Sequence, residues 1–444
     1  MNILQEFDTI AAIATPAGTG GVGIIRISGN NAFQIIEKIF RGKKIETGKI
    51  CYGEIVDNGK ILDEVIILSF KSPHSYTGED VIEIQCHGGI NVIKNILNLV
   101  IKSGARMAER GEFTKRAFLN KKMDLSQAEA VADIIHAKTS DFATQSVKNL
   151  AGALHKNIKS IRSDIFELLS KVIAGIDFPE DVKEPEYDYL ISETEKIIKK
   201  IKNILKNADA SNVMRSGIKV AIAGCPNVGK SSLFNSLLNL DRAIVTDIAG
   251  TTRDILRENI DLSVPVTLID TAGIRDTENE IEKIGIEYTR QAVDEADFVI
   301  FIYDANVGFT KEDDEIFELI KEKPHLIAGN KTDLGINGEF LPKTIKLSTL
   351  TGDGLETVKD RLKNYVEAYN GEDMEFTTNL RQQNCLKNAL TSLDNAITAE
   401  KEHKIQDLIS IDLKSALLSL DELTGEIITD DILNNIFENF CIGK

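Results

Sequence analysis

The sequence predicts three domains of different fold class in one chain. A mixed α+β domain is expected over residues 1–120, an all-α helical domain over residues 121–212 and 373–444, and an α/β domain over residues 213–372. Two observations indicate this order. Apolar stripes with helical spacing occur on both sides of the middle segment, and within that segment short β-rich runs alternate with helical ones. Such alternation is typical of a doubly wound sheet, so we expect an α/β domain inserted into a helical one.

The first 120 residues are expected to form a mixed sheet with helices. Two helical segments, NAFQIIEKIF and INVIKNILNLVIKSG, lie between or after β-rich runs. Runs of β-branched residues bounded by glycine and polar clusters favour strands. The predicted strands are IAAIATP, GVGIIRIS, GEIV, EVIILSF and DVIEIQCHGG.

The helical domain is predicted from apolar stripes. One stripe recurs at steps of three and four from Val147 to Val172 and indicates a single long helix that ends near Phe178. A second stripe covers residues 190–204, and a third group covers residues 386–420. This spacing places apolar side chains on one helix face. Because these segments flank the α/β domain in the sequence, we expect them to pack together.

Composition excludes several classes of protein. A formal net charge of −17 over 444 residues disfavours coating of nucleic acid by phosphate neutralisation alone. One basic stretch, residues 106–122, is interpreted as a solvated helix face. Five cysteines without CxxC spacing favour a reducing compartment and disfavour a disulfide framework or a zinc site. With no run of eighteen apolar residues and no signal-peptide pattern, we expect no membrane span and a cytoplasmic protein.

The α/β domain opens with a phosphate-binding motif. Residues Gly224 to Ser231 read GCPNVGKS, which fits GxxxxGK[ST] between a predicted strand and the helix KSSLFNSLLNL. Glycines let backbone N–H groups turn toward phosphates, and the helix N-terminus adds a positive end. We expect Lys230 to reach the β- and γ-phosphates and Ser231 to ligate magnesium.

Further motifs identify the base as guanine. The sequence DTAG, residues 270–273, follows a predicted strand about forty residues after the phosphate loop, and NKTD, residues 330–333, follows the strand HLIAGN. Asp333 can accept two hydrogen bonds from the guanine edge that adenine cannot donate. Leu347-Ser348-Thr349 ends the next strand and is expected to complete the base pocket. Together these motifs predict a Ras-like P-loop GTPase domain, and hence a GTP-hydrolysing enzyme.

Two residues narrow the mechanism. Ile274 follows DTAG where Ras-type GTPases carry the glutamine that orients the attacking water, and an isoleucine cannot do this. The acidic segment DTENEIEKIG supplies the nearest polar groups. Asn227, inside the phosphate loop, is either a turn residue or a ligand of a monovalent cation.

The sequence resembles the MnmE (TrmE) family of tRNA-modification GTPases over nearly its whole length. The resemblance lies in DTIAAIATPAGTGGVGIIRISG, SYTGEDVIEIQCHGG, GEFTKRAFLNKKMDLSQAEA, GCPNVGKSSLFN, VTDIAGTTRD, DTAGIR and the terminal CIGK. The GTPase loops alone fit many relatives, whereas the N-terminal strings and the CIGK tail are far more specific to this family.

The resemblance implies an activity and its partners. Such proteins are homodimers built from an N-terminal folate-binding and dimerisation domain, a helical domain and an inserted GTPase domain. With the flavoprotein MnmG, in a heterotetramer, they add a (carboxymethyl)aminomethyl group at carbon 5 of the tRNA wobble uridine. The one-carbon unit comes from a folate, 5,10-methylenetetrahydrofolate, of which 5-formyltetrahydrofolate is an analogue. Potassium (K+) supplies the positive charge that an arginine finger gives elsewhere, beside magnesium (Mg2+).

The resemblance also assigns roles to residues. Potassium ligands would be Asn227, Thr246, Ile248 and Thr251, and magnesium ligands Ser231 and Thr252. Glu282 matches the water-positioning glutamate, and Arg26, Glu83, Lys122 and Lys444 match folate contacts. The nucleotide site that the motifs and the resemblance imply consists of Asn227, Val228, Gly229, Lys230, Ser231, Ser232, Thr246, Asp247, Ile248, Ala249, Gly250, Thr251, Thr252, Asp270, Thr271, Ala272, Gly273, Asn330, Lys331, Asp333 and Ser348.

Several of these residues have a simpler interpretation. Arg26 lies in an apolar strand pattern, where a structural ion pair would look the same, and Glu282 is one acid among several nearby. His87 reads as a turn or packing residue, and Cys441 as an unreactive small hydrophobe. The sequence departs from the family at Arg110, where proline is usual.

A second departure is Thr349, where the family carries alanine. It lies at the back of the base pocket, where we expect it to alter nucleotide affinity and not base identity. At the level of the whole chain, two other functions stay open: a GTPase switch of the ribosome-assembly kind, and a folate-dependent transferase that does not act on tRNA.

Overall fold

The computed structural model describes residues 8–16, 18–240, 256–262, 264–270, 290–337, 340–367, 369 and 374–444. The chain divides into two compact units. The first contains residues 1–132, 149–199 and 384–444, and the second contains residues 133–148 and 200–383. Each unit is therefore built from segments that are far apart in the sequence.

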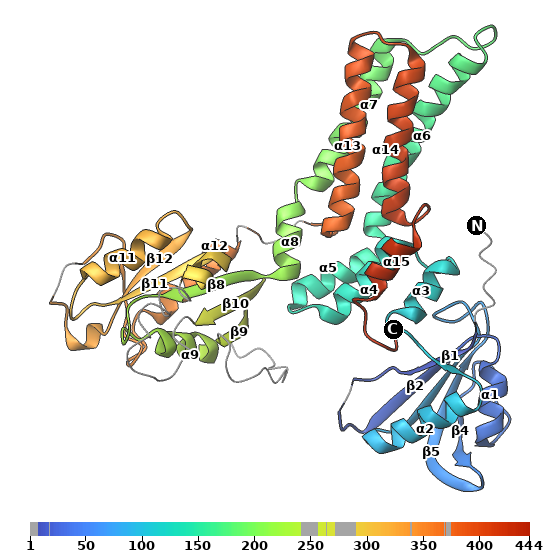
Figure 1. The fold of residues 1–444 in the computed structure, drawn as a ribbon, viewed down its shortest axis with the longest axis horizontal. Helices are drawn as coiled ribbons and strands as arrows, with labels where there is room; N and C mark the ends of the chain where they lie inside the picture. The colour runs from blue at the N-terminus through green and yellow to red at the C-terminus, as the bar shows by residue number, and fades with distance from the viewer. Residues whose placement is uncertain are drawn as a thin grey trace. The chain divides into compact units, whose positions relative to one another are not determined.

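The N-terminal part of the first unit is a seven-stranded sheet with helices (Figure 1). The strand order is β3-β4-β5-β6-β2-β1-β7, and neighbouring strands are antiparallel except β1 and β7. The predicted strands and helices are confirmed, and the short strands β3 and β7 were not predicted. The elements are β1 (Ile10–Ile13), β2 (Val22–Ser28), α1 (Ala32–Ile39), β3 (Phe40–Gly42), β4 (Cys51–Asp57), β5 (Lys60–Phe70), β6 (Val81–His87), α2 (Ile90–Lys102) and β7 (Arg106–Met107).

A group of helices completes the first unit. Long helices from both sides of the inserted segment pack side by side, with α6 against α14 and α7 beside α13 (Figure 1). Their apolar stripes face inward, since Ile161 of α6, Ile197 of α7 and Leu413 of α14 are all buried. The elements are α3 (Glu112–Leu119), α4 (Leu125–His136), α6 (Ala153–Asp177), α7 (Tyr187–Leu205), α13 (Leu380–Lys401), α14 (Gln406–Thr424) and α15 (Asp430–Phe437).

Helix α7 shows how the sequence produces this packing. Its predicted stripe is confirmed, because Leu190, Ile197 and Ile201 are buried. Between them, Glu193 pairs with Lys196 at 2.6 Å, and both side chains reach solvent. This alternation of buried apolar residues and paired charged residues is that of an amphipathic helix.

Two expectations for the helical segments are wrong. The stripe from Val147 to Val172 is not one helix, because the chain turns at Gly152, which has a φ of 90° that favours glycine, and α6 begins after it. Val147 is accordingly exposed. The basic stretch 106–122 is not only a solvated face, since Arg116 is 2% exposed and pairs with Glu112 at 2.8 Å and Glu79 at 3.3 Å. The pair with Glu79 ties α3 to the loop before β6.

The second unit is an α/β domain around a six-stranded sheet of order β13-β12-β11-β8-β10-β9, parallel except at β9. Its central strands are buried on both faces, as expected for a parallel sheet covered by helices. The predicted alternation is confirmed. The elements are α5 (Ser140–Leu150), α8 (Ala208–Ser216), β8 (Ile218–Ala223), α9 (Lys230–Leu240), β9 (Leu256–Asp261), β10 (Pro265–Asp270), β11 (Phe298–Asp304), α11 (Lys311–Ile320), β12 (His325–Asn330), the 3-10 turn η1 (Thr332–Leu334), β13 (Ile345–Lys346) and α12 (Leu355–Glu367).

The core of the second unit includes a residue from far upstream. Phe142 of α5 is 2% exposed and belongs to the same apolar cluster as Met214 and Val266. Arg215 lies over the Phe142 ring at 5.6 Å and pairs with Asp133. Residues 133–148 therefore contribute to the α/β unit. Among the described residues, no helix combines the length and the apolar composition needed to cross a membrane.

Candidate functional site

The phosphate loop lies between β8 and α9 at the carboxyl end of a central strand. Lys230, the first residue of α9, is 9% exposed, and its Nζ donates to the carbonyl oxygens of Gly224 at 2.9 Å and Cys225 at 2.8 Å. Asn227 has a φ of 61°, a left-handed conformation that asparagine tolerates better than most residues. The carbonyl oxygens of Gly224 and Cys225 thus hold the lysine ammonium against the loop.

The NKTD loop, residues 330–333, passes so close to Gly229 that only glycine fits there. Its φ is 103°, and a Cβ at this position would lie 2.2 Å from Nδ2 of Asn330. Asn330 is 1% exposed, and its Nδ2 donates to the carbonyl oxygen of Val228 at 2.7 Å. Asn330 therefore fastens the NKTD loop to the phosphate loop, and any side chain at position 229 would break this contact.

The remaining base-side residues are also held in place. Ser348 is fully buried, and its Oγ donates to Oδ1 of Asp333 at 2.6 Å. Lys331 has a φ of 64°, and its Nζ pairs with Asp304 at 2.7 Å. These bonds fix the Asp333 carboxylate at the ends of β12 and β13, where two parallel strands finish side by side.

Thr349 adds a contact to this loop. Its N donates to Oδ1 of Asn330 at 3.0 Å, and its Oγ1 accepts from Nδ2 of the same residue at 3.3 Å. Alanine, which the resemblance leads us to expect at position 349, has no hydroxyl and could not accept this bond. The departure at Thr349 thus strengthens the fastening of Asn330.

Part of the predicted nucleotide site lies outside the described residues. This applies to Thr246, Asp247, Ile248, Ala249, Gly250, Thr251, Thr252, Thr271, Ala272, Gly273 and Glu282, and to the side chain of Asp270, which ends β10. The described members, including Ser231 and Ser232 in the first turn of α9, come from loops at the carboxyl ends of β8, β12 and β13. These parallel strands end at one edge of the sheet.

A second candidate site lies in the first unit around Arg26. Arg26 on β2 pairs with Glu83, its register partner on β6, with Nε 2.8 Å from Oε1. The Arg26 guanidinium lies over the rings of Tyr76 at 5.4 Å and Phe113 at 5.7 Å. The structural ion pair expected for Arg26 is therefore present, and the two aromatic rings pack against its guanidinium.

The C-terminal tail reaches the same place. Nη1 of Arg26 donates to the carbonyl oxygen of Gly443 at 3.2 Å. The backbone N of Phe113 donates to the backbone oxygen of Lys444, also at 3.2 Å. Gly443 has a φ of 97°, and a Cβ there would lie 2.3 Å from the carbonyl oxygen of Ile13. Only glycine fits this close approach to β1.

The electrostatics of this site are set by its two cations. Burial lowers the pKa of the Lys444 ammonium, the charge of Arg26 lowers it further, and Glu83 opposes the shift. An anion placed between Lys444 and Arg26 would relieve their repulsion. Burial raises the pKa of the Tyr76 hydroxyl, which shares a 2.8 Å hydrogen bond with Thr114.

Lys122 lies apart from the other three predicted folate contacts. Its Nζ donates to the carbonyl oxygen of Pro73 at 3.0 Å. Pro73 belongs to the connection between β5 and β6 that also carries Tyr76. The structure therefore brings Arg26, Glu83 and the tail together and links Lys122 to them through this connection.

Sequence reasoning missed Tyr76 and Phe113, because ring contacts with Arg26 join residues about fifty and ninety positions apart. Their presence in the strings SYTGEDV and GEFTKRAF is the one signal that could have found them. His87 is exposed, ends β6 and bonds through Nδ1 to Asp63 at 2.7 Å, so it is a strand residue and not the expected turn residue. Cys441 is exposed and carries a free thiol.

Comparison with known proteins covers almost the whole chain. The family described as GTP-binding protein TrmE N-terminus matches residues 9–122, and the MnmE helical domain family matches residues 125–441. The tRNA modification GTPase MnmE of Alkaliphilus metalliredigens is 44% identical over 98% of this chain and 99% of its own length. The protein of the same name from Thermotoga maritima is 44% identical over 98% of this chain and 100% of its own.

Solved structures resemble the chain over a smaller part. Aquifex aeolicus Era bound to GDP and aluminium fluoride is 26% identical, and the match covers 39% of this chain and 66% of that one. The TM-score is 0.27, so this likeness supports no inference about function.

Proposed function

This chain belongs to the MnmE family of tRNA modification GTPases, and on that premise we propose that it works with the flavoprotein MnmG on the wobble uridine. The chain is a GTP-hydrolysing enzyme of tRNA modification. The proposed product carries a (carboxymethyl)aminomethyl group at carbon 5, and the proposed one-carbon donor is 5,10-methylenetetrahydrofolate. The proposal of a folate donor rests on one observation: Arg26 contacts both Glu83 and the C-terminal tail.

The proposed GTP site is made of the phosphate loop and the NKTD loop. Lys230 would release the loop carbonyls and donate to the phosphates, a change that conserves its hydrogen bonds. Asp333, held by Ser348, would accept from the guanine edge. Guanine selection follows, because adenine would leave this carboxylate without donors.

Two ions are proposed beside the phosphates. Ser231 and Thr252 would hold magnesium, and Asn227, Thr246, Ile248 and Thr251 would hold potassium, which would neutralise charge as phosphate leaves. Asn227 stands inside the phosphate loop with a φ of 61°, as a turn residue does, and the proposed ligand is the oxygen of its side chain.

The attacking water needs a residue to position it, and we assign this role to Glu282, because Ile274 cannot perform it. Glu282→Ala should lower GTP turnover by about a hundredfold or more, the usual contribution of a positioned general base, while nucleotide affinity barely changes. Single-turnover hydrolysis and nucleotide binding measure the two quantities. Normal turnover in this variant would assign the role to another acid, such as Glu280 or Asp276.

The proposed folate site fits the chemistry of its ligand. The pterin ring of a folate presents N–H donors to a carboxylate such as Glu83, and its glutamyl tail is anionic and suits Arg26, Lys122 and Lys444. Tyr76 and Phe113 offer flat apolar surface next to Arg26. When bound, the folate would supply a carbon at the oxidation level of formaldehyde, and these residues would bind and orient it.

The proposed domain bounds and assembly complete the function. We propose that residues 1–120 bind folate and form the homodimer, that 121–212 with 373–444 form the helical domain, and that 213–372 form the GTPase domain. The enzyme would act in the cytoplasm, where tRNA is modified, as a complex of two copies with MnmG.

Reconstitution tests the proposed function. The purified chain, the flavoprotein, GTP and an unmodified tRNA should yield the modified wobble uridine only when methylenetetrahydrofolate is added. An equal yield without the folate would contradict the donor. Modification without this chain would contradict its place in the reaction.

A further inference from the structure

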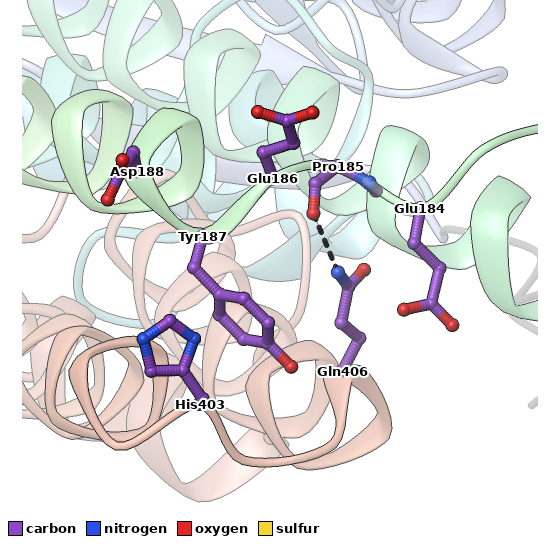
Figure 2. A pocket seen from close by; sticks show the side chains of 7 residues that line it. All are labelled: Glu184, Pro185, Glu186, Tyr187, Asp188, His403 and Gln406. Atoms are coloured by element: carbon purple, nitrogen blue, oxygen red, sulfur yellow. Dashed lines mark hydrogen bonds between the residues drawn. The ribbon is translucent and has the colours of Figure 1, made fainter.

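A pocket of about 330 Å³ lies at one end of the long helices of the first unit (Figure 2). It is formed where the connection between α6 and α7 meets the connection between α13 and α14, and its lining runs from Glu184 to Asp188 and includes His403 and Gln406. The first connection passes close to α6. A Cβ at Gly175 of α6 would lie only 2.9 Å from Cα of Glu184. This pocket belongs to neither site described above.

Gln406 gives the pocket its chemical preference. The residue is 4% exposed, and its Nε2 donates to the carbonyl oxygen of Pro185 at 2.8 Å (Figure 2). That bond fixes the amide orientation and leaves Oε1 as an acceptor. Within the described part of the chain, Oε1 has no hydrogen-bond partner. Because buried acceptors in folded proteins are nearly always satisfied by protein or by water, this oxygen can accept a hydrogen bond from a ligand that carries an N–H or O–H donor.

The charges around the pocket favour a cation. Glu186 pairs with Lys183 at 2.9 Å, whereas Glu184 and Asp188 make no ion pair with any described residue. The nearby Lys404 pairs with Glu402 at 2.7 Å. The net charge of the lining is therefore negative.

Acidic residues at a helix start also stabilise the helix, and Asp188 stands in the first turn of α7. The acids alone would therefore not identify a site. The orphaned acceptor of Gln406 is an independent observation, and it excludes a simple anion, which has no proton to donate. No group of three or more histidine, cysteine or acidic side chains is placed to hold a metal ion among the described residues. The two observations together favour an organic cation.

An aromatic ring completes the pocket. The Tyr187 ring meets the His403 ring edge-on, with centroids 4.6 Å apart, and the Tyr187 hydroxyl donates to the carbonyl oxygen of Lys404 at 2.7 Å. With the hydroxyl engaged, Tyr187 offers its ring to the pocket (Figure 2). Ring faces attract ammonium groups and also pack against aliphatic chains.

We propose that this pocket binds a primary ammonium group on an aliphatic stem. The ammonium donates to Oε1 of Gln406, the carboxylates of Glu184 and Asp188 balance its charge, and the stem packs on Tyr187. Such a group occurs on free polyamines and on lysine side chains of partner proteins. The proposal goes beyond tRNA modification and does not depend on GTP or folate.

Calorimetric titration of the full-length protein at fixed ionic strength tests the pocket. The double variant Glu184→Gln/Asp188→Asn should weaken binding of spermidine by about fivefold, the loss of two partly screened charge contacts. The matched control Glu180→Gln/Asp181→Asn removes the same charge from the same connection without touching the lining, and it should leave binding unchanged. An equal loss in both variants would overturn the proposal in favour of general attraction to an acidic protein, and GTP turnover should stay unchanged in both.

Probe chemistry tests the role of Gln406 and separates the sources. Butylammonium should bind more tightly than butyltrimethylammonium, which has the same charge and stem but no N–H donor, and Gln406→Met should remove this preference. Equal binding of the two ions would overturn the assignment. Tighter binding of spermidine than of Nα-acetyl-lysine methylamide would identify a polyamine site, and the reverse order a lysine-docking site. Binding of neither would contradict the proposal.

Discussion

At the residue scale, Asp333 shows how the carboxylate that we propose selects guanine is positioned. Ser348 donates to it at 2.6 Å, and the Ser348 hydroxyl in turn accepts from the backbone N of Thr351. Replacing Asp333 with asparagine puts an amide donor where guanine also donates. We expect Asp333→Asn to weaken GTP binding by about a hundredfold, the cost of two hydrogen bonds to a charged group, and to favour xanthosine nucleotides. Competition binding with GTP and xanthosine triphosphate measures this; unchanged GTP affinity would refute the role of Asp333.

Asn227 supports a second prediction at this scale. If its side chain ligates potassium, GTP turnover should be about tenfold or more faster in potassium than in sodium at equal ionic strength, because a charge near the leaving phosphate lowers the barrier. The Asn227→Ala variant should lose the difference, while Asn235→Ala, at an exposed position of α9, serves as the control. Equal rates in the two salts for the unaltered enzyme would mean that the loop holds no such cation.

Whether a site residue can be predicted from the sequence depends on how far it lies, along the chain, from the residues that it contacts. Lys230, Asn330 and Asp333 lie in short contiguous motifs, and spacing alone placed them at strand ends. Tyr76 and Phe113 were missed, because their contact with Arg26 exists only after β2, the connection before β6 and α3 have packed. Thr349 was seen as a departure, but its two bonds to Asn330 could not be read from the sequence.

At the element scale, α13 carries a buried acid. Glu400 is fully buried, and its Oε1 accepts from Thr194 of α7 at 2.9 Å. Burial raises the pKa of the Glu400 carboxyl to about 7. The folded pKa exceeds the unfolded one, so this group's contribution to stability is present below about pH 4.5 and is lost as the pH rises through about 7.

We therefore expect Glu400→Gln, which keeps an acceptor for Thr194, to raise the free energy of unfolding at pH 8 by about 1–3 kcal/mol. The gain should shrink at pH 5, where the native carboxyl is already protonated. Urea midpoints followed by circular dichroism at both pH values measure it. A gain that does not depend on pH would point to packing instead of titration.

The tail is the element with the clearest functional test. Deleting residues 441–444 removes the carbonyl that accepts from Arg26 and the oxygen that accepts from the Phe113 backbone. Binding of 5-formyltetrahydrofolate should weaken by about tenfold or more, since one direct cation and the alignment of another are lost. Intrinsic GTP hydrolysis should persist, because the α/β unit does not contain the tail. Calorimetry on the truncated chain, with Cys441→Ser as control, decides this: equal affinity would make the tail a bystander.

Most elements were predicted because their periodicity is local. The stripe of α7 and the β-rich runs of the α/β domain needed no tertiary information. The break at Gly152 was missed because the steps of three and four continue across it, from Leu150 to Leu154, while the backbone turns at a glycine with positive φ. The glycine at position 152 was the one sequence feature that could have indicated the break.

At the scale of the whole molecule, the sequence predicted the insertion of an α/β domain between helices that belong together. It did not predict that α5 contributes Phe142 to the core of the α/β unit, because a single aromatic residue on a short polar helix carries no periodicity. The family relationship covers both the N-terminal and the helical parts. It favours tRNA modification over a ribosome-assembly switch or a transferase without tRNA.

We propose that GTP hydrolysis by this chain serves modification of the tRNA wobble uridine. Mass spectrometry of tRNA nucleosides from cells that lack the chain tests it most directly. We expect loss of the modified wobble uridine, restoration by the unaltered chain, and no restoration by Lys230→Ala, which removes the phosphate-loop ammonium. A full complement of the modified nucleoside in the deletion strain, or full restoration by Lys230→Ala, would contradict it.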